Sequence, residues 1–307
     1  MADPERAFLL TDRYTQVVRV LYRVLVFNLA VAGVKIVLGY LTGAVSILSE
    51  GFHSLTDSAS NVVALVGVSI ARRPPDEEHP YGHRKYETMA SLGILVFLVV
   101  VLVQVLAAAY DRLVSGTVPR VFPEGIGVMA VTLVVNVLVV VYEMRAARQL
   151  NSEVLQADAM HTRSDVLTSA TVLAALFGVW WGYAWLDPLA ALVVAVFIGR
   201  AGWYIAHEAS RILSDQTVIA EDDVRAVVRS VPEVLGCHRI RTRGSADHVF
   251  MDLHVWLDGR TPLEAAHSTS HAVKDRLMKR FPHLADVVIH IEPPPSTTPN
   301  SQDANSQ

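Results

Sequence analysis

The chain has 307 residues, of which 52% are hydrophobic and 18% are charged. Charged residues make up about a quarter of an ordinary soluble protein, so this composition indicates a membrane protein. A formal net charge of -4 leaves no basic excess to neutralise phosphates and argues against nucleic-acid binding, and the single cysteine, Cys237, excludes an intrachain disulfide.

Six stretches are long and apolar enough to cross a bilayer, which requires roughly 20 mostly apolar residues. The third, fourth and fifth contain no Asp, Glu, Lys or Arg, whereas the first contains Lys35 and the sixth contains Arg200. Together they predict a six-helix membrane domain over residues 24–207. The predicted spans are Val24–Leu41, Ala44–Ala71, Leu92–Ala109, Gly125–Tyr142, Val166–Leu186 and Leu189–Ala206.

The second span also contains Glu50, His53 and Asp57. Ionisable side chains are costly inside a bilayer and usually serve a function there. His53 and Asp57 are spaced i, i+4, and His161 and Asp165 repeat this spacing at the start of the fifth span, so each helix presents an imidazole and a carboxylate on one face. Two such faces would suit tetrahedral Zn²⁺, whereas interhelical hydrogen bonds or salt bridges are the alternative.

Lysine and arginine predict the orientation, because short cytoplasmic loops carry more of these residues than the loops outside. They are frequent in residues 1–23 and in the second and fourth connections, and absent from the first and fifth. Residues 1–23 are therefore predicted to be a cytoplasmic N-terminal segment, and both termini to be cytoplasmic. No apolar stretch precedes Val24, so we expect no cleaved signal peptide.

Residues 208–293 have the composition of a soluble domain. Apolar periodicity predicts the order αββαβ, a small sheet with helices on one face. A domain of this size buries little core alone, so association with a second copy is expected. The tail, residues 294–307, is rich in Pro, Ser and Asn and is predicted to be disordered. The predicted elements are Glu221–Ser230, Val234–Thr242, His248–Trp256, Pro262–Phe281 and Asp286–Ile291.

Two further groups of possible metal ligands lie outside the spans. The loop after the second span contains Asp76, His79 and His83, and its prolines prevent a continuous helix. This loop could fold around an ion or form a solvated polar turn, and the residues alone do not decide between the two. The soluble domain contains a third group, for which the residues alone slightly favour ordinary surface histidines over a metal site. The group consists of His238, His254, His267, His290 and Glu292.

Five stretches of the chain contain most of these residues: SILSEGFHSLTDSASN, DEEHPYGHRKYE, ADAMHTRSDVLTS, AHSTSHAVKDRL and VVIHIEP. They resemble the motifs of the cation diffusion facilitators, which are zinc-transporting proton antiporters of bacterial inner membranes and eukaryotic organelles. The resemblance covers nearly the whole chain. It implies six membrane helices with a cytoplasmic metallochaperone-like α+β domain, a homodimer in the lipid bilayer, and transport in place of enzymatic activity. The chain lacks a long His-rich loop between the fourth and fifth spans, and so is similar to compact bacterial members of the inner membrane.

Carried over residue by residue, the resemblance implies three metal sites and a charge interlock between Lys85 and Asp215. Glu292 stands where many bacterial relatives have Asp, a change that keeps the carboxylate and lengthens its arm. The implied sites are a transport site at His53, Asp57, His161 and Asp165, a loop site at Asp76, His79 and His83, and a cytoplasmic-domain site at His238, His254, His267, His290 and Glu292.

The ligand types predict which ion is carried and what drives it. A His/Asp/His/Asp set favours Zn²⁺, with Fe²⁺, Co²⁺ and Cd²⁺ as alternatives. A metal binds neutral imidazole and ionised carboxylate, so metal binding releases protons and protonation releases metal. The sequence therefore predicts efflux of a divalent cation by proton-coupled antiport with alternating access, with Zn²⁺ as the preferred candidate for the transported ion. A membrane-bound metal sensor is the other alternative, and no HExxH motif supports an intramembrane hydrolase.

Overall fold

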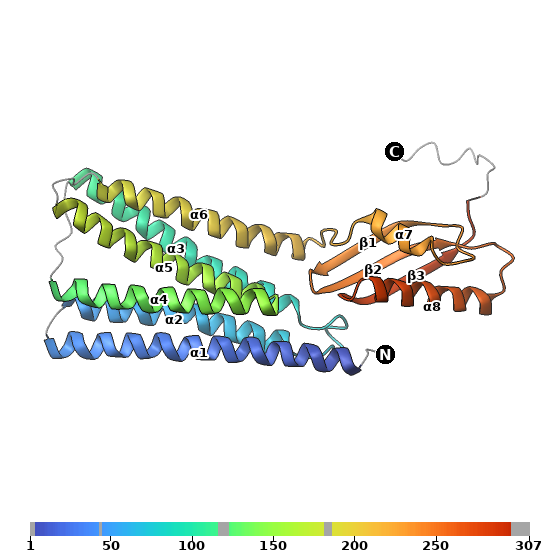
Figure 1. The fold of residues 1–307 in the computed structure, drawn as a ribbon, viewed down its shortest axis with the longest axis horizontal. Helices are drawn as coiled ribbons and strands as arrows, with labels where there is room; N and C mark the ends of the chain where they lie inside the picture. Colours follow the sequence, from blue (N-terminus) through green and yellow to red (C-terminus); the bar gives the residue numbers. More distant parts are fainter. Residues whose placement is uncertain (1–3, 43–44, 116–122, 181–185, 296–307) are drawn as a thin grey trace. The chain divides into compact units, whose positions relative to one another are not determined.

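The computed structural model describes residues 4–42, 45–115, 123–180 and 186–295. The chain divides into two compact units, Met1–Ser210 and Arg211–Gln307. The first unit is built from long helices, and the second combines helices with a small sheet (Figure 1).

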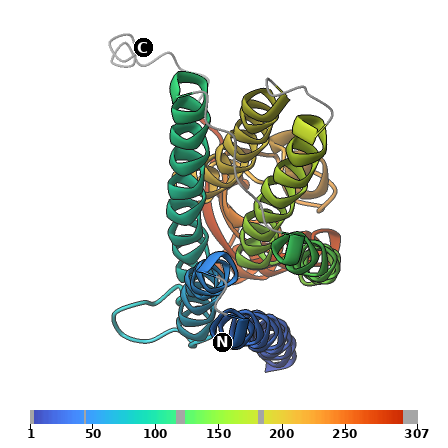
Figure 2. The same cartoon turned by 90° about the vertical axis from the view of Figure 1, so that its left-hand side faces the viewer.

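The six predicted membrane helices are confirmed, with different ends. The fifth predicted span included Leu186, but residues 181–185 lie outside the described part of the chain and Leu186 begins the sixth helix. The first two helices run side by side (Figures 1 and 2). The helices are α1 (Pro4–Thr42), α2 (Val45–Ala71), α3 (Lys85–Ser115), α4 (Pro123–Leu150), α5 (Glu153–Trp180) and α6 (Leu186–Leu213).

Helix α1 also includes residues 4–23, which the sequence placed before the first span. Tyr14, Val17, Leu21 and Val24 are all buried in the core of the first unit. Their spacing of three and four residues puts them on one face of the helix. The arginines between them lower the hydropathy of this stretch, so the predicted first span begins at Val24, well after the start of the helix.

The apolar helices have surfaces suited to lipid. Within the described residues, three helical stretches are long and apolar enough to cross a membrane: Arg13–Leu38, Lys85–Ser115 and Ala130–Leu150. On α3, the side chains of Val96 and Val103 are 63% and 59% exposed. Extended exposed apolar surfaces are rare on soluble proteins and mark contact with lipid or a partner.

The second unit has the predicted αββαβ order. Strand β2 lies in the centre of the sheet, antiparallel to β1 and parallel to β3. Helix α8 connects the two parallel strands, as a parallel pair requires a crossover. The elements are α7 (Glu221–Val228), β1 (Gly236–Ser245), β2 (His248–Trp256), α8 (Leu263–Arg280) and β3 (Leu284–Glu292).

Alternation along β2 gives the sheet two different faces. Met251 and Leu253 are buried in a core that also contains Val228 of α7 and Leu277 of α8. Successive side chains of a strand point to opposite faces, so His254, which follows Leu253, belongs to the face away from these helices.

Candidate metal centres

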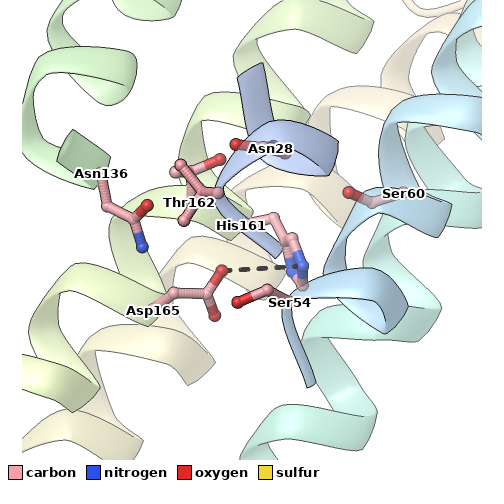
Figure 3. Close-up of a pocket in the computed structure, with 8 residues that line it drawn as sticks. Asn28, Ser54, Ser60, Asn136, His161, Thr162 and Asp165 are labelled. Carbon is pink, nitrogen blue, oxygen red and sulfur yellow. Dashed lines mark ion pairs between the residues drawn. The ribbon is translucent and has the colours of Figure 1, made fainter. Parts of the chain in front are cut away.

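The first unit contains a small polar cavity among its helices (Figure 3). Its volume is about 30 Å³, and about 10–15 Å³ suffices for one water molecule, so a single ion without its hydration shell fits. All but one of the lining residues are polar. The cavity is lined by Asn28 and Val31 of α1, Ser54 and Ser60 of α2, Asn136 of α4, and His161, Thr162 and Asp165 of α5.

His161 and Asp165 face the same space within this cavity (Figure 3). Nε2 of His161 lies 3.9 Å from Oδ2 of Asp165, and the side chain of His161 is 3% exposed. The i, i+4 spacing on α5 therefore brings a nitrogen and an oxygen ligand together at a buried position.

The side chains of His53 and Asp57, the other half of the predicted transport site, lie outside the described part of the structure. Their backbone belongs to α2. Ser54 and Ser60 of the same helix line the cavity that holds His161. Helix α2 therefore borders the cavity, and the four-ligand site remains a prediction.

A buried polar network lies beside the cavity. The carboxyl groups of Asp158 on α5 and Glu143 on α4 are both fully buried. Ser60 Oγ donates a hydrogen bond to Asp158 Oδ1 at 3.2 Å, and the Asn61 amide donates to the other oxygen. The Asn28 amide donates to Asn61 Oδ1 at 2.9 Å, so the network joins α1, α2 and α5.

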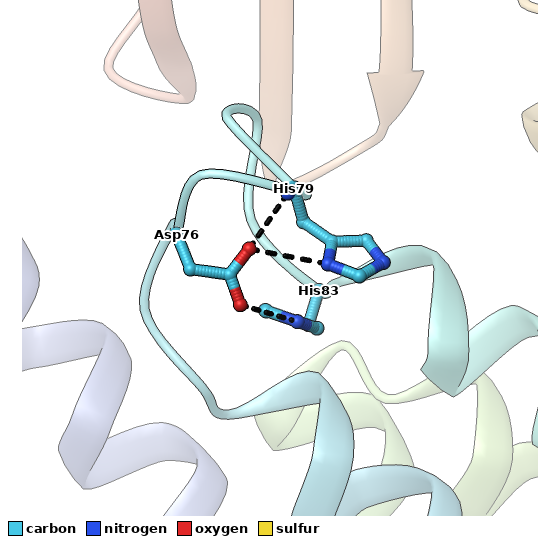
Figure 4. A group of neighbouring side chains, drawn as sticks. All are labelled: Asp76, His79 and His83. Carbon is cyan, nitrogen blue, oxygen red and sulfur yellow. Dashed lines mark hydrogen bonds and ion pairs between the residues drawn. The ribbon is translucent and has the colours of Figure 1, made fainter.

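The loop between α2 and α3 brings its three predicted ligands together (Figure 4). The ligand atoms of Asp76, His79 and His83 all lie within 4.8 Å of one another. Asp76 Oδ1 lies 3.2 Å from His79 Nδ1, and Asp76 Oδ2 lies 3.3 Å from His83 Nε2. The loop closes through Gly82, whose φ of 83° suits glycine and whose N–H donates to the His79 carbonyl at 2.9 Å.

Hydrogen bonds prepare two of these groups for metal binding. The backbone N–H of His79 donates to Asp76 at 2.6 Å and lowers the pKa of that carboxyl below its ordinary value, which favours the ionised form that binds metal. His83 Nδ1 donates to the Pro74 carbonyl at 3.2 Å, which leaves Nε2 as an acceptor facing Asp76. Two facing acceptors require a proton or a cation between them.

In the second unit, strand register places three histidines in one row. His254 of β2 pairs with His238 of β1 on one side and with His290 of β3 on the other. Glu292 lies next to this row: it contacts His238 Nε2, accepts a hydrogen bond from His254 Nδ1 at 3.1 Å, and lies 3.8 Å from His290 Nε2. Trp256 Nε1 also donates to Glu292 at 3.1 Å.

The longer arm of Glu292 therefore places its carboxylate among the histidines. Hydrogen bonds from His238, which has the larger effect, and from His254 lower the pKa of Glu292 to about 2. The ligand atoms of His238, His254 and Glu292 lie within 4.8 Å of one another, which is compatible with a shared metal ion. The arrangement supplies two nitrogen ligands and one carboxylate, a set suited to Zn²⁺.

Two family models match nearly all of the chain. The cation efflux transmembrane domain matches residues 21–214, and the cation efflux protein cytoplasmic domain matches residues 218–294. The chain belongs to the cation diffusion facilitator family. This cation diffusion facilitator is accordingly a multi-pass membrane protein that exports divalent metal cations, and it is a transporter and no enzyme.

Several relatives are similar over most of this facilitator's length. The cation-efflux pump FieF of Serratia proteamaculans is 35% identical over 263 residues, which cover 85% of this chain and 87% of the relative. An uncharacterized transporter of Methanocaldococcus jannaschii is 30% identical over 274 residues, covering 87% and 95%. Metal tolerance protein C1 of Arabidopsis thaliana is 31% identical over 276 residues, covering 84% and 59%.

Two histidines and one cysteine of the facilitator lie apart from the row of ligands. His267 is exposed on α8, and its ring lies 4.6 Å from that of His271. Within the described chain it is not among the residues whose ligand atoms cluster around Glu292. Cys237 is buried in the core on the helix side of the sheet, as expected for a packing residue.

Two buried carboxyl groups of the facilitator, those of Asp158 and Glu143, were not predicted from the sequence. Asp158 lies before the predicted fifth span and Glu143 directly follows the fourth, so neither lies inside an apolar stretch. A signal was available, because Asp158 precedes His161 by three residues and so lies near the same helix face. The predicted interlock of Lys85 and Asp215 would join the two units and stays a prediction.

Proposed function

We propose that this protein exports Zn²⁺ from the cytoplasm through a site formed by His53, Asp57, His161 and Asp165. The observation that carries the proposal is the pairing of His161 and Asp165 in a polar, ion-sized cavity that α2 also lines. Two nitrogen and two oxygen ligands suit tetrahedral Zn²⁺. Fe²⁺, Co²⁺ and Cd²⁺ remain alternatives, because affinity alone separates neighbouring divalent metals poorly.

Proton coupling follows from the chemistry of the ligands. The imidazole of His161 must be neutral and the carboxyl of Asp165 ionised to bind a metal ion. Protons that arrive from the outside would therefore displace the metal, and metal that arrives from the cytoplasm would displace protons. Alternating exposure of the site to the two sides of the membrane then gives antiport.

We further propose that the other two clusters hold Zn²⁺ without transporting it. The loop cluster of Asp76, His79 and His83 and the cluster around Glu292 lie outside the membrane core, where a bound ion would order a loop or a dimer interface. The protein is proposed to act as a homodimer in a bacterial inner membrane with both termini in the cytoplasm. Lys85 and Asp215 are proposed to connect the membrane and cytoplasmic domains.

Reconstituted protein tests the transport proposal. Proteoliposomes with an imposed pH gradient are given Zn²⁺, Fe²⁺, Co²⁺ or Cd²⁺, and the fluxes of metal and protons are recorded together. We expect Zn²⁺ movement with opposite proton movement, and loss of both in His161→Ala. His283→Ala, which changes a histidine outside the three clusters, is the matched control.

Three outcomes would contradict parts of the proposal. Full flux in His161→Ala would contradict the assigned transport site. Zinc flux that continues without proton movement would contradict antiport. Faster transport of another metal would contradict zinc as the preferred cargo. Zinc binding without any vectorial flux would favour a membrane-bound metal sensor.

A further inference from the structure

A buried lysine side chain donates a hydrogen bond to a residue that lines the proposed transport cavity. Lys35 lies on α1, and its side chain is buried, with the residue 3% exposed. Its Nζ donates a hydrogen bond to Ser54 Oγ at 3.0 Å. Ser54 lines the same cavity as His161 and Asp165. A charged side chain within a membrane-spanning helix is costly and is kept for a function.

Close packing of α1 against α2 helps to hold Lys35 in this place. A Cβ atom on Gly51 would lie 2.6 Å from Ile36 Cγ1 and 2.9 Å from the backbone nitrogen of Ile36, closer than real atoms approach. Only glycine at position 51 therefore lets the helices meet at this level. Lysine in a membrane helix usually extends toward the membrane surface, whereas here it reaches the neighbouring helix one turn beyond Gly51.

We propose that the Lys35 ammonium is a built-in cation of the transport site that lowers its affinity for metal and promotes release. The inference rests on the proposed function of His161 and Asp165. In the empty site, the ammonium would offset the negative charge of the carboxylates. When a metal ion enters, the ammonium repels it, and the repulsion acts through a medium of lower dielectric than water, where charges interact several times more strongly.

The competing explanation is a structural one, in which Lys35 only packs between α1 and α2. The two explanations predict different metal affinities when the charge of Lys35 is removed. Lys35→Met keeps most of the length and apolar stem of the side chain and removes its charge. A built-in cation predicts tighter metal binding in this variant, whereas loss of a packing residue predicts weaker or unchanged binding.

Zinc titration of the full-length protein tests the inference. The measurements use a background in which His83→Ala and Glu292→Gln disable the loop and cytoplasmic-domain clusters, so that the membrane site dominates. We expect Lys35→Met to bind Zn²⁺ about tenfold more tightly and to release it more slowly. Lys35→Arg keeps the charge and is expected to remain within about twofold of the parent. Turnover in proteoliposomes should fall in Lys35→Met, because release becomes slower.

The outcomes separate this inference from the proposed function. If His161→Ala abolishes zinc binding while Lys35→Met leaves the affinity unchanged or weaker, the built-in cation is overturned and the transport site stands. If His161→Ala leaves zinc binding and transport intact, both the proposed transport site and the built-in cation are overturned. Lys35→Gln is a second neutral variant that can still hydrogen-bond to Ser54, and it must also bind zinc more tightly. If it binds like the parent while the Met variant binds tightly, the effect comes from the lost hydrogen bond and the inference is overturned.

Discussion

Nε2 of His161 lies 3.9 Å from Oδ2 of Asp165, one helical turn further along α5. This separation is too long for a hydrogen bond between the imidazole and the carboxylate. Ligands at about 2.0–2.2 Å from a tetrahedral Zn²⁺ lie roughly 3.3–3.6 Å apart. A small rotation of either side chain would therefore bring both atoms into contact with one metal ion.

We expect Asp165→Asn to reduce zinc export about 100-fold or more while the protein remains folded. The substitution keeps the shape of the side chain and removes the negative charge that a divalent ion requires. Initial rates of zinc uptake into proteoliposomes measure the effect. Asp252→Asn, which changes an aspartate on the sheet of the second unit, is the control and should leave the rate unchanged. Comparable rates in the two variants would exclude Asp165 as a ligand.

The two histidines of the loop cluster should contribute unequally. His83 is 5% exposed and is oriented by the Pro74 carbonyl, whereas the side chain of His79 is 36% exposed. Loss of an outer-shell partner that orients a metal ligand already costs about 10–100-fold in affinity. We expect His83→Ala, which removes the oriented ligand itself, to weaken zinc binding at the loop by at least this amount, and His79→Ala to weaken it less. Zinc titration with the other two sites disabled measures both, and the reverse order would contradict the geometry.

The cluster around Glu292 should make the second unit sensitive to acid. The pKa of Glu292 is lowered from 4.5 to about 2 by its histidine neighbours. Because the folded form favours the ionised carboxylate, this stabilisation is complete above about pH 4.5 and is lost as the pH falls toward 2. Amide hydrogen exchange of β2 and β3 in the full-length protein, measured between these pH values, should report the loss.

Glu292→Gln provides the comparison for this pH dependence. Glutamine keeps the size of the side chain and cannot ionise, so the part of the acid sensitivity that comes from residue 292 should disappear. The variant should also lose zinc binding at this cluster, because the carboxylate ligand is gone. An unchanged exchange profile in the variant would show that other groups cause the acid sensitivity.

The sequence predicted the second unit well because its strands alternate cleanly between apolar and polar residues. The predicted elements put His238 and His254 on adjacent strands and His290 on a third, which the structure extends to include Glu292. The sequence could not determine register between the strands, which puts His290 opposite His254 and the carboxylate of Glu292 within reach of His238. Register depends on contacts between strands that are distant in the sequence.

In the first unit, the sequence located the helices from hydropathy but missed buried groups that depend on packing. The i, i+4 spacing accounts for the 3.9 Å between His161 Nε2 and Asp165 Oδ2. It gave no reason to place Asp158 against Ser60, which is a contact between two helices. The helix before Val24 was missed for a related reason, because Tyr14, Val17 and Leu21 pack into the core of the first unit and Arg13 pairs with Glu87, which are contacts between helices that are distant in the sequence.

A buried ion pair accounts for part of that attachment and leads to a stability prediction. Arg13 Nη1 lies 3.1 Å from Glu87 Oε2 at the start of α3, and both side chains are largely buried. Ser152 Oγ also donates to Glu87 at 2.6 Å, and Arg13 Nε donates to the Leu150 carbonyl at 2.7 Å. Glu87 therefore joins α1 to α3 and to the connection between α4 and α5.

We expect Glu87→Ala to lower the free energy of unfolding by about 3–5 kcal/mol, because it removes the carboxylate that balances the buried charge of Arg13. Arg241→Ala is the matched control. It breaks an ion pair with Asp252 of similar length, 3.2 Å, but the arginine side chain is 74% exposed, so its loss should cost less than about 1 kcal/mol. The free energy of unfolding of both variants is measured in detergent by adding denaturant, and hydrogen exchange follows each unit separately. Equal small effects would mean that the N-terminal half of α1 is held by apolar packing alone.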